Sequence, residues 1–124
     1  MPISNASTAA ASNTAYLVYT ALLTQSGTSA PTATVLQNTL GGSIVWTRFS
    51  AGNYRGTLAN AFPNAEKFVG NSGIINAAGG SELYGFVVTR IASSIVVVQT
   101  GEYINGGGLD DCLNQTFIEI RVYS

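Results

Sequence analysis

The chain has 124 residues, a formal net charge of −1 and charged side chains at only 9% of its positions, while 46% of its residues are apolar. This length is that of one ordinary domain, which can form a modest core without covalent cross-links. Nucleic-acid binding and membrane insertion are both disfavoured, because the five Lys and Arg residues form no cluster and no segment approaches the roughly 18 consecutive apolar residues of a membrane helix.

The first 14 residues are small and polar and contain no aromatic side chain. Such a composition predicts a flexible or extended N-terminal arm over residues 1–14, followed by a single β domain over residues 15–124. The start of the chain has neither the basic residues nor the apolar stretch of a secretory signal peptide.

Residues 15–25 alternate between two faces, and one face carries Leu17, Tyr19 and Leu23. The aromatic and β-branched residues predict a strand, and the Leu and Ala content leaves a helix as the alternative. Because both faces of this strand are apolar, we expect it to be central in a sheet or to lie at an interface. Tyr19 is therefore a candidate interface residue.

Further short strands are separated by segments rich in Gly, Pro, Asn and Ser. We expect them at residues 32–40, 43–50, 53–59, 83–92, 94–103 and 116–124, with a short strand interrupted by Gly70 within residues 68–75. Two pairs are predicted to form hairpins, 43–50 with 53–59 and 83–92 with 94–103. No segment shows the helical period of about 3.6 residues. The pattern predicts an all-β fold, a β-sandwich of jelly-roll type, with a small β-barrel as the alternative.

The final strand, residues 116–124, alternates strictly. Its aliphatic residues at 118, 120 and 122 are expected to face the core. The other face carries two aromatic and two oppositely charged side chains: Phe117, Glu119, Arg121 and Tyr123. This combination suits an intersubunit surface that is buried but only partly apolar. A strand that simply faces solvent is the equal alternative.

The residues that usually carry catalysis are scarce, since the chain has no His and one Cys. Without an imidazole nearby, Cys112 is interpreted as a small buried thiol rather than a nucleophile. Asp110 and Asp111, with Glu102, offer oxygen ligands, but their spacing matches no calcium loop and a solvated turn is the simpler interpretation. We predict no metal, no cofactor and no enzymatic activity. A hydrolase using two facing carboxylates is the weak alternative, because the pairing of acids in space is not readable from the sequence.

The low charge carries the main functional prediction. Ser, Thr, Asn, Ala and Gly replace the missing ionic groups, and a surface of hydroxyls and amides is dehydrated at lower cost than a charged one. We therefore expect much of the exterior to be buried against other subunits.

A resemblance supports the same prediction. Residues 19–58 contain Tyr-Thr-Ala-Leu-Leu-Thr-Gln-Ser-Gly-Thr, Ala-Pro, Asn-Thr-Leu-Gly and Gly-x-Tyr-x-Gly-Thr-Leu, and residues 117–123 read Phe-Ile-Glu-Ile-Arg-Val-Tyr. These segments resemble short, mostly uncharacterised proteins of tailed bacteriophages, prophages and environmental viral sequences. The resemblance implies a virion-associated protein, such as a fibre tip, tail component or head decoration, and proteins of this kind are often trimers. It names no catalytic residue.

The leading hypothesis is a non-enzymatic structural or adhesion module of a phage-like particle, located in the virion and assembled as a homo-oligomer, a trimer by resemblance. Loops at residues 60–67 and 105–115 are expected to contact other virion proteins or a host surface receptor. The alternative is a carbohydrate- or small-ligand-binding module, in which exposed aromatic side chains stack on the ligand. The candidates for stacking, each of which could equally be a core or interface residue, are Trp46, Tyr54, Tyr84 and Tyr103.

Overall fold

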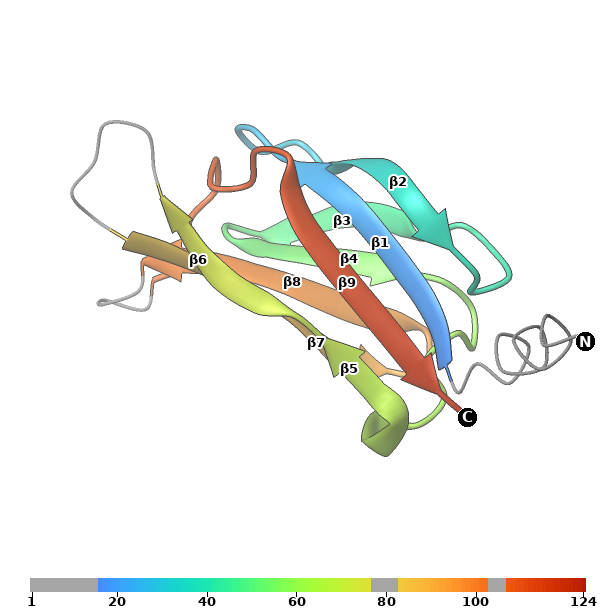
Figure 1. Cartoon of the computed structure of the whole chain (residues 1–124). Coiled ribbons are helices and arrows are strands. Elements are labelled where there is room, and N and C mark those ends of the chain that lie inside the picture. Colours follow the sequence, from blue (N-terminus) through green and yellow to red (C-terminus); the bar gives the residue numbers. More distant parts are fainter. Residues whose placement is uncertain (1–15, 77–82, 103–106) are drawn as a thin grey trace, which may run out of the picture.

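The computed structural model describes residues 16–76, 83–102 and 107–124, and within them the chain forms two antiparallel sheets packed face to face (Figure 1). The predicted arm at residues 1–14 lies outside this description. The four-stranded sheet has the order β2 (Thr32–Asn38), β1 (Tyr16–Thr24), β9 (Thr116–Tyr123), β5 (Phe68–Gly70). The five-stranded sheet has the order β3 (Val45–Ser50), β4 (Asn53–Thr57), β8 (Ile95–Glu102), β7 (Leu83–Ala92), β6 (Ser72–Asn76).

The predicted β-sandwich is confirmed, and the alternative, a closed barrel, is not formed. The strand order departs from a jelly roll, which is built from two interlocked Greek keys. Four pairs of consecutive strands, β1–β2, β3–β4, β6–β7 and β7–β8, are instead neighbours in one sheet. Local hairpin pairing therefore dominates this topology.

The predicted strand positions are confirmed, with ends that differ by no more than two residues. Both predicted hairpins form, β3 with β4 and β7 with β8, and the second turns at residues 93–94. The loop at residues 60–67 contains a short 3-10 helix, Ala65–Lys67, whose N-cap Asn64 accepts a hydrogen bond from the Glu66 N–H.

The core lies between the sheets, where one face of each strand is buried. From β1 come Tyr19, Ala21 and Leu23, and from β9 come Ile118, Ile120 and Val122, all at most 6% exposed. The opposing sheet contributes Trp46, Tyr54, Val88, Val96 and Val98, and the connecting segments contribute Phe62 and Leu113. The inward alternation predicted for the last strand is thereby confirmed.

The chain changes sheets at Gly70 and Asn71, where the sequence predicts a single interrupted strand. β5 pairs with β9 and β6 pairs with β7, so the two are consecutive pieces of one extended segment, as Figure 1 shows. A side chain at position 70 would overlap the Val88 carbonyl oxygen, so this crossing requires glycine. The Asn71 N–H donates to the Glu119 carbonyl in one sheet, and its own carbonyl accepts from the Val88 N–H in the other.

The pairing of β2 with β1 contains one irregularity. Thr20 lies opposite Gln37 and Ala21 opposite Val35, so Leu36 is an extra residue that forms a β-bulge. None of the residues that the structure describes forms a helix long and apolar enough to cross a membrane.

Candidate functional site

The margin of the sandwich formed by edge strands β2 and β3 is here called the open side. It lies opposite the margin where β5 runs into β6, because each sheet has two edges and those two share one side. Four large apolar side chains are exposed on the open side: Val35 (49%), Leu36 (55%), Val45 (62%) and Phe49 (60%). Ten such residues are exposed among those described, so these two strands hold a disproportionate share.

Strand β2 is exposed along its whole length, including the face that should be covered. Ala33 pairs with Leu23 and Val35 pairs with Ala21, so both point to the same side of the sheet as those core residues. All seven residues of β2 are nevertheless exposed. The five-stranded sheet therefore ends before it covers β2, and the apolar interior of the sandwich opens to the surface there.

The open side has little charge: β2 has none, and the Arg55 guanidinium of β4 lies 3.6 Å from the centre of the Phe49 ring on β3. The first charged residue of the chain is Arg48, so β1, β2 and the first half of β3 contain none. Arg48 itself points to Asp110 rather than to the edge. Natural edge strands are commonly protected from pairing by Lys, Pro or inward-pointing charges. β2 has none of these protections and keeps only the bulge at Leu36.

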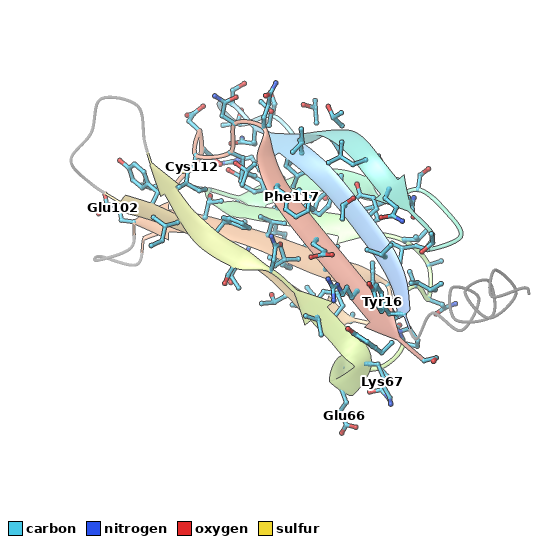
Figure 2. The ribbon with its side chains drawn as sticks, in the orientation of Figure 1. Tyr16, Glu66, Lys67, Glu102, Cys112 and Phe117 are labelled. Atoms are coloured by element: carbon cyan, nitrogen blue, oxygen red, sulfur yellow. The ribbon has the colours of Figure 1, made fainter. Side chains whose placement is uncertain are left out.

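The outer face of the four-stranded sheet holds four of the predicted interface residues. Phe117, Glu119, Arg121 and Tyr123 of β9 all point to this face, as expected from their alternation. Figure 2 shows Phe117 and Tyr16 at opposite ends of the face, and Phe117 is 45% exposed.

The charged and aromatic side chains of this face make their polar and ring contacts with one another. The Arg121 Nε lies 3.1 Å from the Glu119 carboxylate, and the Arg121 guanidinium lies 4.8 Å from the centre of the Tyr16 ring. The rings of Tyr16 and Tyr123 pack with centroids 5.1 Å apart. Hydrogen bonding to Tyr123 and to Glu119 raises the pKa of Arg121, so the cation is held firmly in this cluster. The face is thus stable in water without a partner.

Tyr19, the fifth predicted interface residue, is in the core and unavailable to another chain. It is 1% exposed, and its hydroxyl accepts a hydrogen bond from Trp46 Nε1 at 3.2 Å. Burial raises its pKa. The prediction was wrong because both faces of β1 are apolar, so alternation alone did not indicate which face turns inward.

A polar network closes one end of the sandwich around Asp110. Arg48 Nη2 donates to Asp110 Oδ2 at 2.7 Å, and Arg48 Nε lies 3.2 Å from both carboxylate oxygens. The Tyr54 hydroxyl lies 2.6 Å from Asp110 Oδ1 and 2.8 Å from Gln25 Oε1. Its single proton goes to the carboxylate, the stronger acceptor. Asp110 is therefore no solvated turn residue but an anchor for the segment that links β8 to β9.

The electrostatics of this network follow from its contacts. The hydrogen bonds from Arg48 lower the pKa of Asp110 to about 2, partial burial opposes the shift, and Tyr54 and the Gly52 N–H add to it. Burial, together with the Asp110 carboxylate, raises the pKa of Tyr54. At neutral pH the network holds one cation, one carboxylate and one neutral phenol.

Gln25 extends the network to the four-stranded sheet. It follows β1 directly, is 3% exposed, and its Oε1, 2.8 Å from the Tyr54 hydroxyl oxygen, accepts from the Asp111 N–H at 2.9 Å. Its Nε2 donates to the Gly27 and Ser29 carbonyls, which fixes the turn after β1. The two sheets are therefore joined here through side chains.

Of the aromatic residues considered for ligand stacking, the three that the structure describes do not form an exposed platform. Trp46 and Tyr54 are buried in the core at 7% and 0% exposure, and Tyr84 is partly buried. Tyr103 lies outside the described residues.

Among the described residues, neither the Cys112 thiol nor the acidic side chains form an activated nucleophile or a metal-binding cluster. Burial raises the pKa of the Cys112 thiol, and its Sγ lies 3.6 Å from the Asp110 carbonyl, a contact that disfavours the thiolate. Over residues 16–76, 83–102 and 107–124, no three His, Cys, Asp or Glu side chains lie close enough to hold a metal ion.

Comparison with protein-family models, curated proteins and solved structures finds no match to this chain. The resemblance to virus-encoded proteins therefore stays a prediction.

Proposed function

We propose that this protein is a structural module that assembles with further copies of itself through the open side. The observation that carries the proposal is the exposure of all seven residues of β2, inward-facing positions included, on an edge strand that contains no charged residue. Exposed apolar area is worth roughly 25 cal/mol per Å² when it is buried, so covering this margin is favourable.

A second copy of the chain is the occupant that fits this surface best. Strand β2 is uncharged and made of aliphatic, hydroxyl and amide side chains, so two such strands meet without repulsion and without burying an unpaired charge. Depletion of charged residues is also what distinguishes the centre of subunit interfaces. The Arg55 cation beside β3 is held over the Phe49 ring.

The wider setting of the proposal is a phage-like particle, in which the module acts as a structural or adhesion component and is a trimer. This setting rests on the resemblance of residues 19–58 and 117–123. Other virion proteins or a host receptor would then contact surfaces that the assembly leaves free.

The test compares two equally exposed apolar residues. Val35 on β2 and Ile91 on β7 are both 49% exposed, so Val35→Lys and Ile91→Lys introduce the same charge at matched positions. Sedimentation velocity of the full chain should show an oligomer for the unaltered protein and for Ile91→Lys. For Val35→Lys the dissociation constant should rise by roughly tenfold or more. Val45→Lys on β3, where the side chain is 62% exposed, serves as the second variant.

Circular dichroism establishes that each variant is folded. An unaltered chain that is a monomer at about 100 μM would overturn the proposal. Equal dissociation by Ile91→Lys and by the two open-side variants would overturn the choice of interface.

A further inference from the structure

The outer face of the five-stranded sheet contains a groove of about 680 Å³. Its floor includes Gly85 of β7, which pairs with Gly101 of β8: the outward position of Gly85 is open, while the Gly107 carbonyl fills the space over Gly101. A volume of this size is typical of sites for small organic ligands.

One wall of the groove is a row of side chains that crosses four strands. Asn53 pairs with Gln99, Gln99 with Val87, and Val87 with Ser72, so these residues of β4, β8, β7 and β6 stand side by side. Ile74, which is 64% exposed, lies opposite Gly85 and continues the floor row at the β6 edge. The groove therefore runs across the strands rather than along them.

Apart from Glu102, the polar side chains that line the groove are neutral. Its lining includes two amide side chains, Asn53 and Gln99, and the hydroxyls of Ser50 and Ser72, and no Lys or Arg. The Asn53 Oδ1 atom is buried and has no hydrogen-bond partner among the described residues. A buried acceptor of this kind is stabilised when a ligand supplies a donor. Glu102, at the end of β8 (Figure 2), adds a carboxylate, so an anionic ligand is disfavoured.

We propose that this groove binds a neutral oligosaccharide. Amide and hydroxyl side chains match the paired donor and acceptor groups of sugar hydroxyls, while Val87 and Ile74 offer apolar contact to the C–H face of a pyranose ring. An extended peptide is less suitable, because the main chains of β7 and β8 are already paired on both sides and cannot add another strand.

The expected affinity of one groove is low. Among the described lining residues the aromatic one is Phe86, which packs against the core and offers no exposed platform, so a dissociation constant of about 1 mM is expected. Several grooves on one assembly would bind a glycan-coated surface with much higher avidity. The groove nevertheless belongs to one chain, and its ligand binding does not depend on the proposed assembly.

The test uses maltotriose, cellotriose and N,N′,N″-triacetylchitotriose as neutral probes and sialyllactose as an anionic one. NMR titration of the full chain should show saturable shifts with a neutral trisaccharide at up to about 10 mM, centred on Gln99 and Val87. Gly85→Leu fills the floor and should weaken binding by roughly tenfold or more. A Cβ at position 85 meets only the Gly73 carbonyl oxygen at 3.5 Å, so this variant is expected to fold.

Thr89→Leu is the matched control, because it places the same side chain on the same face of β7 outside the groove. It should change the affinity by less than about two-fold. Asn53→Ala, which removes the unpartnered amide, is the second variant and should also weaken binding.

Three results would overturn the inference: no binding of any neutral probe, a preference for sialyllactose, or equal effects of Gly85→Leu and Thr89→Leu. Sedimentation of Gly85→Leu should show the oligomer unchanged. Loss of glycan binding is thereby distinguished from loss of assembly.

Discussion

The two margins of this sandwich are closed in different ways. At one margin the main chain itself passes from sheet to sheet, and Asn71 hydrogen-bonds to both. The Asn71 side chain adds two further bonds to β9, donating to the Phe117 carbonyl at 3.1 Å and accepting from the Glu119 N–H at 2.9 Å. At the open side no strand crosses, and the sheets are joined by side chains, namely Trp46 with Tyr19 and the network around Asp110.

This difference is the basis for proposing the open side as the interface. A margin sealed by main chain has paired backbone groups and little exposed interior. A margin held by side chains leaves its edge strands unpaired, and here one of them, β2, also lacks charge. We expect an uncharged edge strand at an unsealed margin to indicate an interface better than the overall scarcity of charge does.

The margin where β5 runs into β6 is here called the sealed margin. Disrupting it should have the largest effect on stability. In Gly70→Ala the new Cβ would overlap the Val88 carbonyl oxygen, a backbone atom that cannot move without disrupting β7. We expect the free energy of unfolding to fall by about 3 kcal/mol or more. Gly85→Ala is the control, since its Cβ would make ordinary van der Waals contact, and urea denaturation compares the two. Equal losses would mean that the crossing is not tightly packed.

Acid should weaken the side-chain network around Asp110. The pKa of Asp110 is lowered from 3.8 to about 2, so its ionised form stabilises the fold fully above pH 4 and this contribution is lost as the pH falls toward 2. We expect a loss of about 1–2 kcal/mol in this interval, less than the full shift implies because solvent partly screens the pair.

Asp110→Asn should abolish that pH dependence and lower the stability at pH 7 by about 2 kcal/mol, since Arg48 loses its counter-charge. Asp111→Asn is the neighbouring control. Its exposed side chain accepts only from the Gly27 N–H, which an amide oxygen can replace. Urea denaturation at pH 7, 4 and 2.5 separates them. Identical acid profiles for the two variants would remove Asp110 from this role.

Substituting one asparagine at each margin should give the smallest difference in stability of these tests. Asn71 at the sealed margin and Asn38 at the open side each donate through Nδ2 to a carbonyl and accept through Oδ1 from an N–H. Asn71→Ala should cost about 2 kcal/mol, because its partners belong to another strand. Asn38→Ala should cost less than about 1 kcal/mol, because water replaces exposed bonds within one loop. The reverse order in thermal unfolding would contradict the sealed-margin description.

The strands were predictable because their signals are local. Alternation and turn residues gave the bounds of β7 and of the hairpin between β7 and β8, and the strict pattern of β9 indicated its buried face. The change of sheet at Gly70 was not predictable, since the sequence shows a glycine within a strand but not the Val88 carbonyl beside it. Contacts between strands far apart in sequence also decide the strand order, which alternation along the chain does not reveal.

The candidate site was predictable only in part. The outward position of Phe117, Glu119, Arg121 and Tyr123 followed from period two, but their mutual pairing with Tyr16 depends on the neighbouring strand. The open side gave one signal in the sequence, the absence of charge before Arg48. The absence of charge supports the proposed interface only together with the observation that the other sheet does not cover β2. The groove was not predictable, because it depends on the alignment of Gly85 with Gly101 across two strands.

The bulge at Leu36 bears on how growth of the assembly ends. A flat, regular edge accepts the next identical strand indefinitely, which is how fibrils elongate. An extra residue bends the strand and increases its twist, so a copy added at this edge is rotated with respect to the previous one. In the proposed assembly, successive rotations would favour a closed ring over an endless filament, and the assembly would thereby have a finite size.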